Sequence, residues 1–244
     1  MEPSEYRTIF TVEDRHWWYV GMRRITLALL DEAYGRSDLR ILDAGSGTGA
    51  AMSYLARYGR VTGIDLSPLA LAFCRERALS RLSQASVTAL PFADASFDLV
   101  TSFDVLYHRA VGDYRHALRE FHRVLRPGGR LLLRLPAHDR LRGRHDVVIH
   151  TARRFSKSEL STSLHENGFV VERLTYANTL LFPAAVAKRM LEPWLPATPS
   201  HSDVTPNSPW LDQVLSAVLG LEACWLRRRD LPFGLSVVAL AHKR

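Results

Sequence analysis

The feature that most constrains the fold of this chain is a glycine-rich turn at the end of an apolar run, Ile41-Leu42-Asp43-Ala44-Gly45-Ser46-Gly47-Thr48-Gly49. A short apolar run bounded by a turn signal is typical of a buried strand. Alternating glycines let the backbone turn sharply and leave no side chain between its N–H groups and a ligand at the start of the next helix. The segment therefore predicts a strand, a tight turn and a helix that bind a nucleoside-bearing cofactor.

Apolar runs of strand length alternate with helical patterns along the rest of the chain, which indicates βαβ units and a parallel sheet. Helices are expected to begin at Ser67-Pro68, after Asp113, at a capping box from Ser156 to Glu159, and at Ser208-Pro209. The helix after Asp113 is expected to end at a turn, Pro127-Gly128-Gly129. Seven strands are expected, over Arg40–Ala44, Arg60–Asp65, Ala85–Ala89, Phe97–Ser102, Arg130–Leu135, Val170–Tyr176 and Leu235–His242.

Composition agrees with one α/β domain. The 244 residues are 47% hydrophobic, enough for a substantial core. The net charge of +7 leaves a polyanionic partner open, although the arginines are spread rather than gathered in one block. Cys74 and Cys224 indicate neither a disulfide framework nor a metal site, which fits a reducing cytoplasm. No signal core or apolar stretch of spanning length is evident, so we expect a cytoplasmic protein without a transmembrane segment.

The glycine turn by itself is compatible with two kinds of cofactor. Gly45 to Ala50 fits G-x-G-x-x-A, and Asp65 follows about 20 residues later, as a dinucleotide-binding pattern requires. An NAD(P)-dependent oxidoreductase therefore remains an alternative. Asp43 favours a cationic ligand, because a carboxylate two positions before the first glycine would repel a pyrophosphate but accept hydrogen bonds from a sulfonium cofactor.

Together with Val61-Thr62-Gly63-Ile64-Asp65-Leu66-Ser67 and Thr88-Ala89-Leu90-Pro91-Phe92, the turn resembles the class I S-adenosylmethionine-dependent methyltransferases, close to the type 11-like, small-molecule-directed branch. The resemblance implies a Rossmann-like α/β fold: a seven-stranded, mostly parallel sheet with helices on both faces and an antiparallel last strand. It implies a single domain over residues 1–244, with an N-terminal helical lid over 1–35 and a helical insertion over 180–230 between the last two strands.

The resemblance also assigns residues to S-adenosyl-L-methionine. Asp43, Gly45 and Gly47 are expected at its amino-acid end. Asp65 is expected to accept hydrogen bonds from the ribose hydroxyls. Ser86 stands where family members often carry an acid for the adenine amino group. The full set of matching positions is Asp43, Gly45, Ser46, Gly47, Gly49, Asp65, Leu66, Ala89, Leu90 and Phe103.

A cluster of ring-bearing residues, His16-Trp17-Trp18-Tyr19, opens the helix that precedes the sheet. These aromatic side chains either anchor the helix on the core or cover the cofactor. In the second interpretation the Trp18 ring favours the methyl sulfonium and Arg23 pairs with the cofactor's carboxylate. Tyr19 is then a candidate substrate contact.

Two histidines follow strands that end near the expected methyl-transfer site. His108 is the first candidate for a general base and His138 the second, with Tyr107 as a substrate contact. For each histidine, an ordinary solvated loop position is equally compatible with the sequence. Similar bacterial methyltransferases also carry a pattern like His145-Asp146, His150 and Arg153-Arg154. We expect His145 and Arg153 to contact an anionic acceptor and expect no metal.

These observations predict in-line methyl transfer to a small-molecule acceptor, anionic or lipid-linked. RNA or other nucleic acid is the alternative acceptor. It is disfavoured because Ser102-Phe103-Asp104-Val105 lacks the Pro-Pro motif of base-amine methyltransferases, and because no cysteine nucleophile follows the fourth strand. A protein that binds the cofactor without catalysing a reaction is a further alternative. The insertion is expected to close the domain as a surface helix, to form a homodimer contact or to contact an apolar acceptor.

Overall fold

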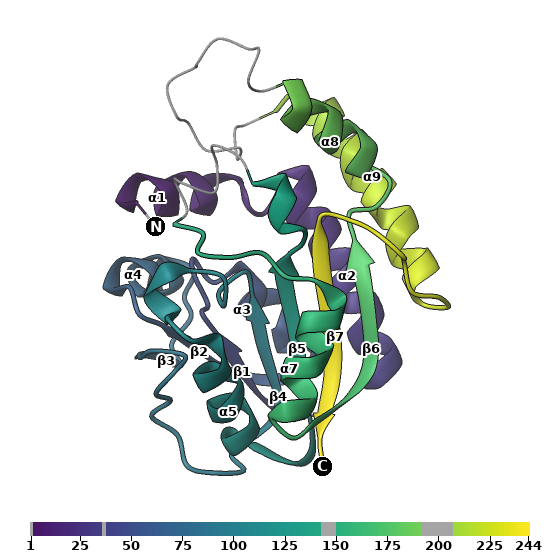
Figure 1. Cartoon of the computed structure of the whole chain (residues 1–244). Helices are drawn as coiled ribbons and strands as arrows, with labels where there is room; N and C mark the ends of the chain where they lie inside the picture. Colours follow the sequence, from purple (N-terminus) through teal and green to yellow (C-terminus); the bar gives the residue numbers. More distant parts are fainter. Residues whose placement is uncertain (1, 36–37, 143–149, 192–206) are drawn as a thin grey trace.

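The computed structural model describes residues 2–35, 38–142, 150–191 and 207–244, and its centre is one seven-stranded sheet (Figure 1). The strand order is β3-β2-β1-β4-β5-β7-β6, in which β7 is antiparallel to both β5 and β6 and the pairs from β3 to β5 are parallel. The predicted fold class is confirmed. The strands are β1 (Leu39–Ala44), β2 (Gly59–Asp65), β3 (Leu82–Gln84), β4 (Phe97–Phe103), β5 (Leu125–Pro136), β6 (Phe169–Ala177) and β7 (Ser236–Lys243).

Helices cover both faces of the sheet. On one face, α2 (Trp17–Ala33), α3 (Ala50–Leu55) and α9 (Pro209–Leu226) share a buried cluster with β1 and β7. On the other, α5 (Tyr114–Val124) and α7 (Lys157–Glu166) pack on β4 and β5. The remaining described α-helices are α1 (Pro3–Val12), α4 (Pro68–Glu76) and α8 (Phe182–Leu191). No helix in these ranges is both long enough and apolar enough to cross a membrane.

Three of the predicted helix starts are capped as their sequences indicate. The Ser67 side chain accepts a hydrogen bond from the Ala70 amide, and the Asp113 carboxylate accepts one from Arg115. Ser156 accepts a hydrogen bond from the Glu159 amide, which is one half of the expected capping box. These bonds satisfy amides that the first helical turn leaves without a partner.

The third strand and the turn after α5 differ from prediction. The strand lies at Leu82–Gln84, three residues earlier than expected, because Ser86 and Thr88 bond to each other and to local backbone. Such local bonds compete with a strand ladder. Pro127-Gly128-Gly129 is an irregularity inside β5 rather than a linker, since the register with β4 shifts between Phe97 and Leu99.

The N-terminal helix α2 and the helix α9 pack tightly against each other. A Cβ atom at Gly21 would lie 2.3 Å from Leu219 Cδ1, so only glycine permits this approach. Arg24 Nη1 donates to the Ser216 carbonyl at 2.7 Å, and the Asp212 carboxylate accepts from the Trp17 amide at 3.1 Å. The helices α2 and α9, which come from opposite ends of the chain, therefore stabilise each other at the carboxyl edge of the sheet.

Candidate functional site

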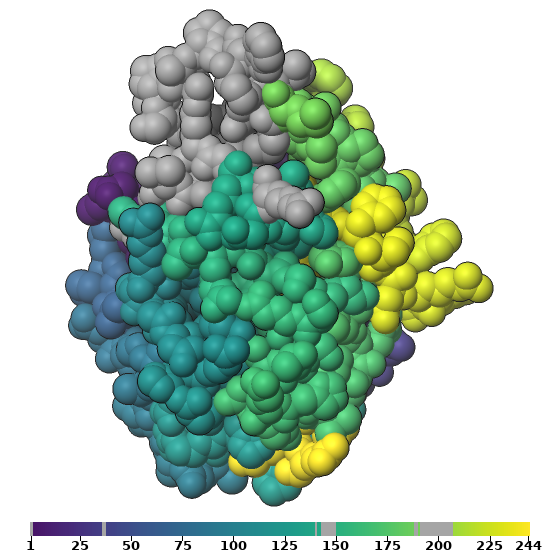
Figure 2. Space-filling model, viewed as in Figure 1, coloured from purple at the N-terminus to yellow at the C-terminus, as the bar shows by residue number. Residues whose placement is uncertain are grey.

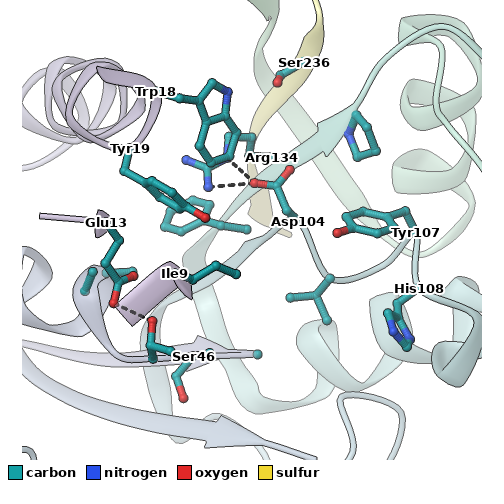
Figure 3. Close-up of a pocket in the computed structure, with 18 of the residues that line it drawn as sticks. Ile9, Glu13, Trp18, Tyr19, Ser46, Asp104, Tyr107, His108, Arg134 and Ser236 are labelled. Atoms are coloured by element: carbon teal, nitrogen blue, oxygen red, sulfur yellow. Dashed lines mark hydrogen bonds and ion pairs between the residues drawn. The ribbon is translucent and has the colours of Figure 1, made fainter. Parts of the chain in front are cut away.

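A cavity of about 1100 Å³ opens at the carboxyl ends of β1, β2, β4 and β5 (Figure 3). This is the edge where parallel α/β sheets bind ligands. The volume exceeds the range of roughly 300–1,000 Å³ found for most ligand pockets. α1, the start of α2, the glycine turn, α8 and α9 complete its walls.

The glycine turn forms one wall of the cavity with exposed backbone. Gly45 has φ +88°, and a Cβ there would lie 2.3 Å from Val105 Cγ2. Gly47 has φ +53° and no atom within 4 Å of the place a Cβ would take. The amides of Gly45 and Ser46 both donate to the Ile64 carbonyl at 2.8 Å, which fixes the turn against β2. Gly45 thus serves packing, whereas Gly47 leaves space for a ligand.

Asp65 ends β2 beside this turn. Its Oδ2 accepts from the Gly47 amide at 2.9 Å, and its Oδ1 accepts from the Ser67 amide at 2.8 Å. A carboxylate offers about four lone-pair sites, so it can accept hydrogen bonds from a ligand in addition to those from the backbone. Asp65 lines the cavity, and its role in binding the ribose hydroxyls stays a prediction.

Asp43 lies deeper in the same wall and is 1% exposed. Its Oδ1 accepts from Thr101 Oγ1 at 2.8 Å, whereas its Oδ2 is buried without a hydrogen-bond partner. Burial raises the pKa of this carboxyl to about 7, against the lowering effects of the Thr101 hydrogen bond and of Arg134. An unpartnered carboxylate oxygen lining a cavity fits a cationic ligand, so the residues present fit the sulfonium cofactor that the sequence predicts.

The sequence interpretation did not single out Arg134, which lies near the centre of the cavity wall (Figure 3). Its guanidinium carbon is 4.9 Å from the ring centroids of both Trp18 and Phe103. Its Nε and Nη2 lie 2.7 Å from Asp104 Oδ2. The available signal was a single arginine in the apolar run Leu131-Leu132-Leu133-Arg134-Leu135, because a buried arginine needs a partner.

Helix α1 contributes a second set of residues outside the sequence prediction. Glu13, just after α1, accepts from Thr48 Oγ1 and from Arg77 Nη2, the latter at 2.8 Å. Arg77 also donates to the Thr48 carbonyl at 3.0 Å and to Asp14 at 2.9 Å. This network attaches α1 to the glycine turn. It brings Glu5, Tyr6 and Ile9 to the cavity wall.

The two predicted bases have different surroundings. His108 lines the cavity, and its Nδ1 accepts from the Ala110 amide at 3.1 Å. Desolvation, with His150 nearby, lowers the pKa of His108 to about 4, so the ring is neutral near pH 7 and carries its proton on Nε2. His138 is outside the cavity lining and stacks on Tyr176 at 5.1 Å.

Most of the predicted cofactor and substrate residues line the cavity, and four described ones, Gly49, Ala89, Leu90 and Arg153, do not. Leu90 is buried in the core and its amide donates to Glu120, while Ala85, Ser86 and Val87 take the place expected for Ala89 and Leu90. Arg153 pairs with Glu159 and stacks on core aromatics. Gly49 caps α3 without lining the cavity, and His145 lies outside the described residues. The predicted residues in the lining are Trp18, Tyr19, Arg23, Asp43, Gly45, Ser46, Gly47, Asp65, Leu66, Phe103, Tyr107 and His108.

The far half of the cavity is mainly apolar, with a few polar groups. Leu181, Leu215 and Leu235 line it, together with the polar side chains of Asn178 and Ser236. Asn178 is 1% exposed, and its Oδ1 is buried without a hydrogen-bond partner. In the described part of the chain, no three His, Cys, Asp or Glu side chains lie close enough to hold a metal ion.

Comparisons with known proteins agree with this geometry. Residues 42–133 match the family model described as Methyltransferase domain. A demethylmenaquinone methyltransferase of Thermus thermophilus is 39% identical over 112 residues, 43% of this chain and 50% of that protein. A malonyl-(acyl-carrier protein) O-methyltransferase of Enterobacter lignolyticus is 39% identical over 121 residues, 49% of this chain and 47% of that protein. The chain thus spans about half the length of the curated relatives it matches.

A solved structure shows the shared fold across almost the whole chain. It contains a methyltransferase in complex with the Haloferax volcanii Trm112 methyltransferase activator, with a TM-score of 0.62 and 21% identity over 98% of this chain and 93% of that one. The matched domain and the glycine turn together support a class I S-adenosylmethionine-dependent methyltransferase domain built around residues 42–133 of this chain.

Proposed function

We propose that this protein transfers a methyl group from S-adenosyl-L-methionine to an apolar small or lipid-linked acceptor. The observation that carries the proposal is the continuity of the cavity. One end is the cradle of Asp43, Gly47 and Asp65, and the other is the apolar half around Leu181 and Leu215. A cofactor at the first end and an acceptor at the second would meet beside Phe103 and Asp104.

The cofactor supplies an electrophilic methyl group on a sulfonium, so the protein's contribution is mainly positioning and exclusion of water. Asp43 and Asp65 would hold the amino-acid and ribose ends. The aromatic ring of Trp18 would favour the positive charge, and Arg23 would pair with the carboxylate. The open position above Gly47 lets the ligand approach the backbone.

The acceptor's polar end would meet a fixed set of polar groups. Asn178 offers a buried carbonyl oxygen without a partner, and Ser236 lies in the same lining. Burial raises the pKa of Tyr19 far above its ordinary value, so this phenol stays neutral and acts as a hydrogen-bond donor. His108 lines the same cavity with a lowered pKa, so its neutral ring suits orientation of an acceptor oxygen more than removal of its proton.

The apolar lining favours an apolar acceptor over an anionic one. Leu181, Leu215 and Leu235 come from three separate segments and converge on this half of the cavity. Of the relatives, one is named for demethylmenaquinone and another for a carrier-linked malonyl group. Arg153, the residue predicted to recognise an anion, is engaged by Glu159.

The proposal is tested by following label from methyl-tritiated S-adenosylmethionine into three fractions from cells: lipid extract, water-soluble small molecules and RNA. Label is expected in the organic phase and is expected to disappear in the Asp65→Ala variant. Label in RNA alone would make the nucleic-acid alternative correct. Stabilisation by NAD but not by S-adenosylhomocysteine in a melting experiment would contradict the cofactor assignment.

A further inference from the structure

Helix α9 carries an apolar face that no described element covers. Trp210, Val214, Leu221 and Trp225 are 66%, 51%, 65% and 57% exposed. Their spacing of four, seven and four residues places them on one side of the helix, which is about 27 Å long at 1.5 Å per residue. Figure 1 shows α9 at the periphery of the molecule beside α2. A row of four large exposed apolar side chains marks an interaction surface.

The opposite side of α9 is fully used. Leu219, Ala223 and Leu226 are buried, with Leu219 against Gly21 of α2. Glu222 is also buried and accepts a hydrogen bond from the Leu180 amide at 2.7 Å. The helix is therefore anchored by one face, and the exposed apolar row is not a consequence of loose packing.

The charges at the C-terminal end of this row are mainly positive, and the one acidic residue there, Asp230, pairs with Arg173. Arg227, Arg228 and Arg229 follow Leu226 at the end of α9 and are exposed, and none of them forms an ion pair with another described residue. The acidic residues of α9 are unavailable, since Glu222 is buried and Asp212 accepts hydrogen bonds from Trp17 and Asn207. The end of α9 and the following turn protrude from the body of the molecule at the yellow end of the colour scale (Figure 2).

The same part of the molecule borders the cavity. Leu215 of α9 lines the apolar half, as do Leu181, Ala184 and Ala185 at the start of α8. Leu180, just before α8, is 53% exposed. The exposed apolar row and the acceptor end of the cavity are thus on adjoining sides of one structural unit.

We propose that α9 binds in the plane of an anionic lipid surface, with its apolar row in the interfacial region and Arg227–Arg229 against the headgroups. Tryptophans at both ends of an apolar helix face and arginines beside them are what a membrane interface favours. A second copy of the chain is a poorer partner, because an isologous contact would present the same face, where the carboxylate next to the arginines, Asp230, is already paired with Arg173. Presentation of a lipid-linked acceptor to the cavity rests on the proposed function, whereas the docking itself does not.

The docking is tested by co-sedimentation of the full chain with two kinds of vesicle, phosphatidylcholine alone and phosphatidylcholine with about 30 mol% phosphatidylglycerol. Binding is expected to be at least tenfold stronger to the anionic vesicles and to weaken in about 0.5 M NaCl. The triple variant R227Q/R228Q/R229Q is expected to lose this preference. W210S/W225S is expected to bind both vesicles poorly, because apolar insertion is lost.

A matched control removes the same charge elsewhere. Arg75, Arg81 and Arg119 are exposed and distant in sequence from α9, and R75Q/R81Q/R119Q is expected to keep at least half of the wild-type binding. Equal loss in the control, or no binding to anionic vesicles by wild type, would overturn the proposal. So would a wild-type dimer that W210S/W225S converts to a monomer in light scattering. Stabilisation by S-adenosylhomocysteine is measured on every variant, so a failure of cofactor binding is recognised separately.

Discussion

Arg134, which is buried, and Asp104, which is half-buried, form an ion pair in the cavity wall, with Nη2 and Oδ2 2.7 Å apart. Arg134 lies on β5 opposite Phe103 of β4, and Asp104 follows Phe103 with φ +56°. The pair joins two neighbouring strands and also holds the Trp18 ring of α2. It therefore links the N-terminal helix to the sheet directly at the site.

The first prediction concerns this pair. Arg134→Met leaves the half-buried Asp104 carboxylate without its partner, and we expect a loss of up to about 3–5 kcal/mol of unfolding free energy, the cost of breaking a buried pair. The double variant R134M/D104N is expected to recover more than half of the loss, because the unpaired charge is gone. Urea unfolding of the wild type, R134M, D104N and the double variant measures the loss in R134M and its recovery in the double variant. Additive losses in the double variant would show that the two side chains do not interact.

The second prediction separates the two glycines at the start of the turn. Gly47→Ala places a Cβ in open cavity space at φ +53°, so we expect a stability cost of about 1 kcal/mol. We also expect at least a tenfold loss of S-adenosylhomocysteine affinity. Gly45→Ala drives its Cβ into Val105 and is expected to lower the melting temperature much more. Calorimetric titration measures the loss of affinity and thermal melts measure the loss of stability. Equal effects of both variants would contradict the assignment of Gly45 to packing and Gly47 to ligand binding.

The third prediction is a pH dependence from Asp43. Its pKa rises from 3.8 to about 7 on folding, so the folded state binds a proton more tightly than the unfolded chain. Preferential protonation of Asp43 in the folded state therefore stabilises the fold fully below about pH 4, and this stabilisation is lost as the pH rises through 7. Between pH 5 and 8 the ligand-free protein is expected to lose on the order of 2 kcal/mol through this group. The Asp43→Asn variant is expected to lack this decrease in unfolding free energy between pH 5 and 8. The same decrease in the variant would show that Asp43 is not its source.

The same group makes cofactor binding pH-dependent. A cationic ligand favours ionised Asp43, so S-adenosylmethionine affinity is expected to increase from about pH 5.5 to 8 in the wild type. The Asp43→Asn variant is expected to bind more weakly and with little dependence on pH. Titrations in buffers of different ionisation enthalpy would detect the proton released. Absence of proton release near pH 6 would argue against contact between Asp43 and the ligand.

The last prediction concerns His108. Because desolvation lowers its pKa to about 4, the ring is neutral between about pH 6 and 8 and kcat/KM is expected to show no inflection from it in that range. His108→Asn preserves an acceptor for the Ala110 amide and is expected to retain the fold. A wild-type inflection near pH 6.5 that disappears in His108→Asn would instead make His108 the general base.

Local sequence patterns were sufficient for much of the fold because they act over a few residues. The apolar run into Asp43, the Ser67 and Asp113 caps and the period of α5 each predict their own element. The third strand was misplaced because Ser86 and Thr88 form local hydrogen bonds that a count of apolar residues does not register. Antiparallel pairing of β7 followed from the family resemblance rather than from its own residues.

By itself, the sequence determined the order of elements, the position of the glycine turn and the acids that end β1 and β2, since backbone freedom and strand-end placement are local properties. Tertiary structure alone decided that Arg134 meets Asp104 between two aromatic rings, that Glu13 attaches α1 to Thr48, and that Arg153 turns to Glu159. Those contacts join residues separated by six to 35 positions, and their partners depend on which strands and helices come together. Burial then sets the charge state of Asp43, because desolvation depends on everything that surrounds a carboxylate and not on its neighbours in the chain.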